Sequence, residues 1–296
     1  MTKRVIIDTD PGLDDAVAIL FALASSKFDV LGLTTVAGNI GLERTTFNAG
    51  SLLAAVGRSD IPVISGAATA LVRANIHAAV VHGNDGLGGL SLPRPMSPHG
   101  TDAASWMARI LLAEPGGKID ILALGPLTNI AHLIERHPEA STRMGRLIVM
   151  GGAIYEPGNA GPASEFNFAC DPEATARVLG SDIKTTIIPL DVTRRVRADR
   201  NYVEALRGSA AGNVAADLLA AYLQDEKTSR PLHDPCVMLL ALQPELFDLE
   251  TIRLSVNVGS DADAGALTVS DSGSTVSVAM RVDVAGVLDL LASGLR

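Results

Sequence analysis

Short apolar runs alternate with longer amphipathic segments along most of this chain. The apolar runs have the length and the β-branched residues of buried strands, and the segments between them have helical spacing. We expect strands at residues 5–7, 29–36, 62–64, 118–124, 146–150 and 185–189. We expect helices at residues 14–20, 42–57, 101–113 and 199–225, with others ending at residue 137 and beginning at residue 171. Strands alternating with helices predict an α/β fold with a mostly parallel central sheet flanked by helices.

The pattern changes in two places. Residues 66–100 lack a clear period and are rich in glycine and proline, as a lid or binding loop would be. Alternating runs at residues 253–256, 266–270 and 275–282 predict a late antiparallel hairpin with a closing helix. We see no repeat, low-complexity tract or Gly/Ser linker, so we predict a single α/β domain over residues 1–296.

Composition excludes several classes of protein. A formal net charge of −9 argues against nucleic acid or an anionic membrane as the main partner. No stretch approaches the ~20 apolar residues of a membrane helix, and Asp8 interrupts the N-terminal apolar run before it reaches signal-peptide length. Cys170 and Cys236 are too few for a disulfide framework and are expected to be small buried hydrophobes. We expect a soluble, cytoplasmic protein.

Four aspartates lie at the end of the first predicted strand and the start of the helix that follows it. They are Asp8, Asp10, Asp14 and Asp15. Carboxylates favour a helix start, and on that ground alone they could be a cap and a solvated turn. Like charges this close are unfavourable unless a cation or shared protons neutralise them, and a hard oxygen-seeking cation such as Ca²⁺ or Mg²⁺ is the simplest solution.

Other polar groups follow later strands. Asn39 follows the second strand, and ligands of open α/β sheets bind beyond the carboxyl ends of the strands. The loop at residues 158–168 carries two asparagines and a glutamate, which can hydrogen-bond several hydroxyls of one sugar. His233 and Asp234 precede an apolar helix. Each motif alone is weak, because Asn and Gly also form ordinary loops.

Taken in order, these motifs resemble the inosine–uridine nucleoside hydrolase family nearly end to end. The matching segments are DTDPGLDDAVAI, VMGGA, NAGPASEFN and HDP. The resemblance implies calcium-dependent hydrolysis of the N-glycosidic bond of ribonucleosides, in nucleoside catabolism and purine and pyrimidine salvage. It also implies the nucleoside hydrolase fold and a homodimer or homotetramer.

The resemblance assigns roles to individual residues. Asp10, Asp15, the main-chain carbonyl of Leu124 and Asp234 would hold Ca²⁺. Asp10 would act as general base on a metal-bound water, and His233 would assist departure of the base as a general acid. Asp14, Asn39, Asn159, Glu165 and Asn167 would bind the ribose hydroxyls, with Phe166 under the sugar and His82 on the leaving-group side. Such charges suit a reaction that builds positive charge on the ribose and negative charge on the departing base.

The nucleobase preference and two other functions stay open. A purine-specific branch stacks the base between tryptophans, whereas Trp106, expected to pack inward, is the only one here, so we expect the His-containing nonspecific or pyrimidine-preferring branch. The segment before His233 carries no tyrosine, and Arg73 and Arg230 are expected to be solvated charges. A metal-dependent phosphatase with Asp8 as nucleophile, a nucleoside-binding sensor, or a hydrolase of a modified riboside are the alternatives.

Overall fold

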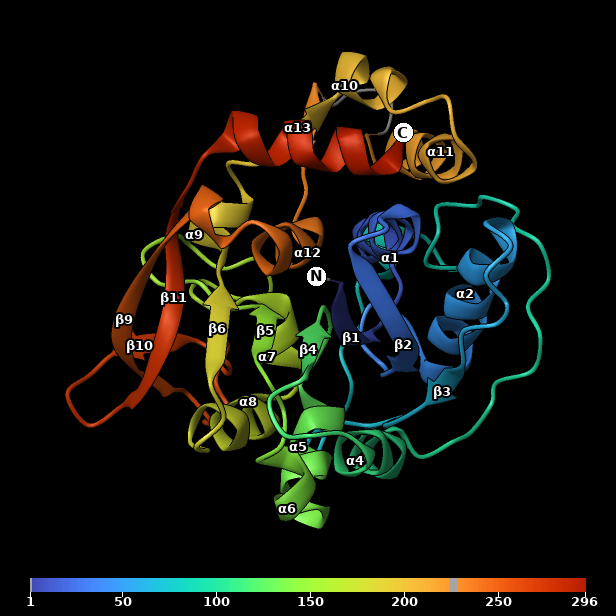
Figure 1. Cartoon of the computed structure of the whole chain (residues 1–296). Helices are drawn as coiled ribbons and strands as arrows, with labels where there is room; N and C mark the ends of the chain where they lie inside the picture. Colours follow the sequence, from blue (N-terminus) through green and yellow to red (C-terminus); the bar gives the residue numbers. More distant parts are fainter. Residues whose placement is uncertain (1, 224–227) are drawn as a thin grey trace.

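One large sheet runs through the computed structural model, which describes residues 2–223 and 228–296 (Figure 1). Its strand order is β10-β9-β11-β6-β5-β4-β1-β2-β3. Neighbours from β3 to β11 pair in parallel, whereas β9 is antiparallel to β11 and β10. The strands are β1 Lys3–Thr9, β2 Phe28–Thr35, β3 Val63–Ser65, β4 Ile119–Ala123, β5 Leu147–Met150, β6 Thr185–Ile188, β9 Phe247–Val256, β10 Leu267–Val269 and β11 Ser274–Val282. The predicted α/β fold is confirmed.

Helices cover both faces of this sheet (Figure 1). On one face lie α1 Leu13–Ala24, α2 Leu42–Ala55, α11 Ala210–Leu223, α12 Pro235–Leu242 and α13 Val284–Leu295. On the other lie α4 Ala103–Ala113, α5 Thr128–Arg136, α6 Pro138–Ser141 and α8 Pro172–Leu179. Short helices complete the set: α3 Ala79–His82, α7 Phe166–Cys170, α9 Leu190–Thr193, α10 Arg200–Ala205 and the 3₁₀ helix η1 Pro244–Leu246. None of the described helices is long and apolar enough to cross a membrane.

The central strand β1 shows why the apolar run at residues 5–7 is continuous. Val5 and Ile7 point into the hydrophobic cluster on the α1 side, and Ile6 points into the cluster on the α4 side. Successive side chains of a strand point to opposite faces, so a strand covered on both faces must be apolar at every position. Trp106 of α4 packs in the second cluster, as predicted.

Two segments differ from the sequence predictions. The single helix expected at residues 199–225 is instead the end of strand β7 (Arg197–Asp199), then α10 and α11. Gly208, between the helices, has a φ of 133°, a conformation that side-chain-bearing residues rarely adopt and that ends a helix. Part of the polar run at 224–230 lies outside the described residues, but its end joins β8 (Ser229–Pro231), which pairs antiparallel with β7.

The C-terminal hairpin is part of the main sheet. β9 and β11 pair antiparallel, as predicted, and β11 also pairs in parallel with β6 through Ser277 and Val278. β11 thereby extends the central sheet, because its second edge meets the free edge of β6. Apart from α3, residues 66–100 are irregular, and an isolated bridge between Ile64 and Gly100 holds their end against the sheet.

Candidate active site

The site forms where four neighbouring strands end. Asp10 follows β1, Asn39 follows β2 and Leu124 follows β4, and these three strands are adjacent in the sheet next to β5. Because parallel strands end at the same edge, residues far apart in the chain meet there. The carbonyl of Leu124 accepts a hydrogen bond from Asn167 Nδ2 at 2.7 Å, which adds the loop after β5 to the same edge.

The carboxylate of Asp10 is held between two glycines. Its Oδ2 accepts a hydrogen bond from the main-chain N–H of Asn39 at 2.6 Å. A Cβ on Gly38 would lie 2.1 Å from Oδ2, and one on Gly125 would lie 2.2 Å from Oδ1, so neither position has room for a side chain. Oδ1 is buried and has no hydrogen-bond partner among the described residues. A buried charged oxygen without a partner is unfavourable, so this atom points to a group that the protein itself does not supply.

Asp15 is bound at both of its carboxylate oxygens. Oδ1 accepts from Thr9 Oγ1 at 2.7 Å and from the Asp10 N–H at 3.3 Å. Oδ2 accepts from the Gly12 N–H at 3.0 Å and from Asn39 Nδ2 at 3.1 Å. Gly12 is the N-cap of α1 and Asp15 is the N3 residue that binds back to it, and these bonds also fix the orientation of Asp15 at the floor of the site.

The buried carboxylates form a cluster suited to a hard cation. Oxygens of Asp14, Asp15 and Asp234 lie within 4.8 Å of one another. Burial raises the pKa of Asp14 to about 7, and burial together with the neighbouring carboxylates raises the pKa values of Asp10 and Asp234 well above their ordinary range. An all-oxygen donor set with excess negative charge fits Ca²⁺ or Mg²⁺. Asp14, which was predicted to bind ribose, is itself a member of this cluster, together with the predicted metal ligands Asp15 and Asp234.

Above the carboxylates lies a cavity of about 350 Å³. Ten of the predicted site residues line it: Asp14, Asn39, His82, Leu124, Asn159, Glu165, Phe166, Asn167, His233 and Asp234. Asp10 and Asp15 are fully buried beneath them. The structure therefore brings together residues from positions 10 to 234 of the chain.

The loop that was predicted to bind the sugar is held by internal hydrogen bonds. Glu165 caps α7 by accepting from the N–H groups of Asn167 and Phe168 at 3.0 and 3.2 Å, and it also accepts from Gly152. Burial raises the pKa of Glu165 to about 7. Asn159 Oδ1 accepts from the Phe166 N–H at 2.8 Å. Asn159 Nδ2 and the second lone pairs of the Glu165 carboxylate are the groups that remain for ligand hydroxyls.

Two histidines line the cavity beside the carboxylates. His82 Nδ1 accepts a hydrogen bond from the Leu13 N–H at 3.1 Å, so the neutral ring carries its proton on Nε2. His233 Nδ1 and Thr193 Oγ1 lie 2.7 Å apart. Burial and nearby arginines lower the pKa of His233 to about 3, and burial lowers the pKa of His82 to about 4, so both rings are neutral near pH 7.

Among the lining residues that were not predicted from the sequence, four have charged or aromatic side chains: Arg194, Arg197, Tyr222 and Arg230. Tyr222 stacks on His82, with ring centroids 6.2 Å apart. The Arg230 guanidinium lies 4.7 Å from the centre of the Tyr222 ring, and its Nε donates to the Tyr222 carbonyl at 2.7 Å. The prediction that Arg230 is a solvated charge was therefore wrong. No local pattern marks these residues, because they come from separate elements: Arg194 follows α9, Tyr222 lies in α11, and the pairing of β7 with β8 brings in Arg197 and Arg230.

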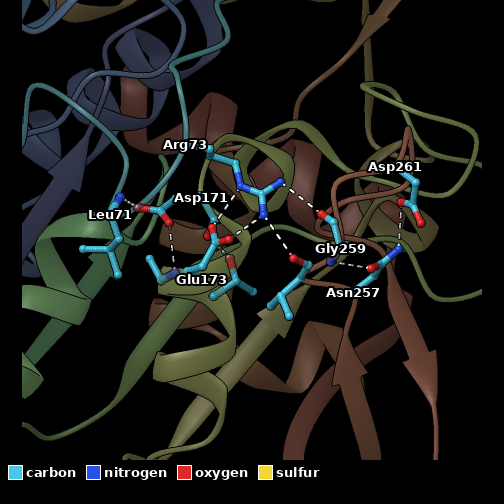
Figure 2. Close-up of polar contacts among 10 residues, drawn as sticks. Leu71, Arg73, Asp171, Glu173, Asn257, Gly259 and Asp261 are labelled. Atoms are coloured by element: carbon cyan, nitrogen blue, oxygen red, sulfur yellow. Dashed lines mark hydrogen bonds and ion pairs between the residues drawn. The ribbon is translucent and has the colours of Figure 1, made fainter.

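Arg73 is also held in place rather than solvated (Figure 2). Its guanidinium pairs with both carboxylate oxygens of Glu173 and donates to the carbonyls of Val258 and Gly259. Beside it, Asp171 accepts from the Leu71 N–H at 2.9 Å (Figure 2). These contacts fasten the irregular segment before α3 to α8 and to the loop after β9. That segment leads directly to Ala78 and His82 in the cavity.

Other predictions concern structural residues. Asn129 donates to Asp8 Oδ1 at 2.8 Å and to the Thr35 carbonyl, and Asp191 accepts from three N–H groups at residues 154–156, so both are structural as predicted. Both cysteines are buried and free. Asp8 is fully buried, is bound by Thr34 at 2.6 Å as well as by Asn129, and does not line the cavity, which removes the basis for a phosphatase nucleophile.

A carboxylate cluster next to the amides of Asn159 and Asn167, at the carboxyl edge of a parallel sheet, is the arrangement expected of a glycoside-cleaving hydrolase. The family model for the inosine-uridine preferring nucleoside hydrolases matches residues 5–289, and the chain belongs to this family. The predicted resemblance and the prediction of an enzyme are thus confirmed.

Similar proteins span the whole chain. It is 38% identical over 310 residues to the pyrimidine-specific ribonucleoside hydrolase RihA of Shewanella woodyi, with 100% of this chain and 99% of that protein covered. It is 39% identical over 311 residues to RihA of Escherichia coli O9:H4, with the same coverage. Among solved structures, the plant nucleoside hydrolase PpNRh1 superposes with a TM-score of 0.92 at 33% identity, covering 100% of this chain and 99% of that one. An inosine-guanosine nucleoside hydrolase superposes with a TM-score of 0.91 at 26% identity, covering 99% and 98%.

Proposed function

We propose that this enzyme hydrolyses the N-glycosidic bond of pyrimidine ribonucleosides and depends on Ca²⁺. The observation that carries the proposal is the position of the carboxylate cluster directly beneath the cavity lined by Asn159, Glu165 and Asn167. The pyrimidine preference is supported by the RihA relatives and by the absence of tryptophan from the cavity lining among the described residues.

Calcium would be held by Asp10, Asp15, Asp234 and the carbonyl of Leu124, with Asp14 beside them. The orphaned Asp10 Oδ1 and the raised pKa values of Asp10 and Asp234 support this donor set. When bound, a hard cation supplies orientation and a lowered pKa to the attacking water. Calcium loading would also remove the repulsion between these carboxylates.

Asp10 would take the proton from that water. Its carboxylate is positioned before substrate arrives, because Gly38 and Gly125 enclose it and the Asn39 N–H fixes Oδ2. A base held in this way loses little freedom on reaching the transition state.

The remaining residues would bind the two halves of the substrate. Asp14, Asn39, Asn159, Glu165 and Asn167 would bind the ribose hydroxyls, with Phe166 against the sugar. Their negative charge stabilises the oxocarbenium-like ribose of the transition state.

His82 and His233 would face the base. A neutral His233 donates a hydrogen bond from Nε2 when the Thr193 hydroxyl donates to Nδ1, and in that form it would assist base departure.

The first experiment is an assay of free ribose from uridine, cytidine, inosine and adenosine, with calcium and after chelation. We expect calcium-dependent release, fastest from the pyrimidine nucleosides. Asp10→Asn should reduce turnover by about 10³-fold or more while leaving the protein folded, which circular dichroism would show. Tight binding of nucleosides without ribose release would instead indicate a sensor. Light scattering in solution would test the predicted homodimer or homotetramer.

A further inference from the structure

The cavity is lined by groups of both charges. Asp14 and Asp234 contribute buried carboxylates. Arg194, Arg197 and Arg230 also line it, and we call these three the arginine rim. Three cations at one cavity stand out because the chain as a whole carries a formal net charge of −9.

The β7–β8 ribbon places the arginine rim. Arg194 follows α9, Arg197 begins β7 and Arg230 lies in β8, where it is paired with Ala198. Arg194, Arg197 and Arg230 all lower the pKa of His233, so their charges lie near this histidine. The position of the rim is therefore built into the fold and does not depend on a flexible side chain finding its place.

The three guanidinium groups differ in how much of their charge is neutralised. Arg194 pairs with Glu156 at 3.2 Å and donates to the carbonyls of Pro157 and Gly158. Arg197 donates to Ser229 Oγ and to the Ser229 carbonyl, both at 2.8 Å. Arg230 donates through Nε to a carbonyl, and its two terminal nitrogens bond to none of the residues 2–223 and 228–296. Among the described residues, Arg230 thus has no carboxylate partner and keeps free donors at the cavity.

Cleavage of the bond between C1′ and the base nitrogen moves an electron pair onto the base. Water supplies the new oxygen at C1′, Asp10 receives the proton of that water, and the base leaves with negative charge. Arg230 and His82 both contact the Tyr222 ring. The Nδ1 atom of His82 already accepts a hydrogen bond from the Leu13 N–H. A guanidinium cannot give up its proton, but it stabilises an anion by charge and by hydrogen bonds.

We propose that Arg230 is a catalytic residue that stabilises the departing nucleobase as an anion, and that the arginine rim selects bases able to leave in that form. Within the pyrimidines this favours uracil, whose anion is delocalised over two carbonyl oxygens, over cytosine. The anion takes up a proton from solvent after release. The inference rests on the proposed nucleoside hydrolysis and adds to it the leaving-group chemistry.

The test compares uridine with 5-fluorouridine, whose base is a more stable anion because fluorine withdraws electrons. Arg230→Gln removes the charge and keeps an amide donor, and Arg230→Lys keeps the charge. The control is Arg281→Gln, because Arg281 of β11 forms an exposed ion pair with Asp248 of β9 and does not line the cavity. Ribose release gives kcat/KM for each variant and substrate, with calcium present.

We expect Arg230→Gln to lower kcat/KM about 10²-fold on uridine and less than about tenfold on 5-fluorouridine, with the lysine variant close to wild type on both. The ratio between the two substrates does not depend on how much of the variant is folded. An equal loss on both substrates would overturn the proposal and leave Arg230 with a structural role at Tyr222. If the wild-type enzyme released no ribose from either nucleoside, the proposed function itself would fail.

Discussion

When divalent cations have been removed, the free energy of unfolding of the protein should fall as the pH rises through neutrality. The carboxylates responsible are buried, and burial raises the pKa values of Asp8, Asp14 and Glu165 to about 7. A carboxyl whose pKa is higher in the folded state binds its proton more tightly there. Its contribution to stability is complete below the pKa of the unfolded chain and is lost as the pH rises through the folded value.

The pH range decides whether histidines or carboxylates dominate the change in the free energy of unfolding. His82 and His233 have folded pKa values of about 4 and 3, so below about pH 6.5 the unfolded chain binds more protons at these residues and stability rises with pH. That effect opposes the carboxylates and fades above the ordinary pKa of histidine. From about pH 6.5 to 8 the two histidines together still gain about 0.8 kcal/mol, which is less than the carboxylates lose.

The magnitude follows from the same values. Each carboxyl with a pKa of about 7 loses about 0.8 kcal/mol on going from about pH 6.5 to full ionisation, so three lose about 2 kcal/mol. Asp10 and Asp234 add to the loss, because their pKa values are raised further. At about 2 °C per kcal/mol for a chain of this size, the melting temperature should fall by about 4 °C or more.

The assay is thermal unfolding followed by circular dichroism, in chelator and in calcium, at about pH 6.5 and about pH 8. Calcium should raise the melting temperature more at the higher pH, because protons compete with the cation for the carboxylates. Asp14→Asn should flatten the dependence in chelator. A chelated protein whose melting temperature rises or stays constant over this range would refute the reasoning.

Three further predictions concern single residues. Gly125→Ala should displace the Asp10 carboxylate, since the new Cβ would lie 2.2 Å from Oδ1, and a loss of stability below ~1 kcal/mol with unchanged activity would contradict this. Arg73→Gln should raise KM several-fold with little change in kcat, because Arg73 fastens the segment leading to His82, whereas the exposed control Arg281→Gln should change neither. His233→Ala should reduce kcat/KM on uridine far more than on a nitrophenyl riboside, whose leaving group needs no help; equal losses would remove that role.

The sequence predicted the parts of the fold and site that local patterns carry. The apolar run at residues 5–7 reports a strand buried on both faces, and Asp15 marks a helix start as well as the site floor. The two helices in place of one could have been foreseen from Gly208, whose φ of 133° breaks the helix. The pairing of β11 with β6 could not, because alternation shows that a strand exists and not which edge it joins.

The site residues missed by the sequence depend on tertiary contacts. In the sequence, Tyr222 looks like an ordinary apolar residue of the predicted helix, and Arg230 looks like an ordinary charged residue of the polar segment before His233. Their role appears only when β8 pairs with β7 and carries Arg230 over the Tyr222 ring. Such contacts leave no periodic signal in the sequence, because Tyr222 and Arg230 belong to different elements and no helix or strand sets the distance between them.

The place of β1 in the middle of the sheet has a consequence for synthesis. β1 leaves the ribosome before its two neighbours in the sheet, and β2 is ready to pair with it soon afterwards, but β4 begins only at Ile119. At about 5–20 residues per second, the second edge of β1 waits for about five seconds or more before β4 exists. During that time this edge presents unpaired backbone groups between two apolar faces, and such an edge is prone to associate with other chains. Nascent chains of this protein should therefore need protection by chaperones until β4 has been made.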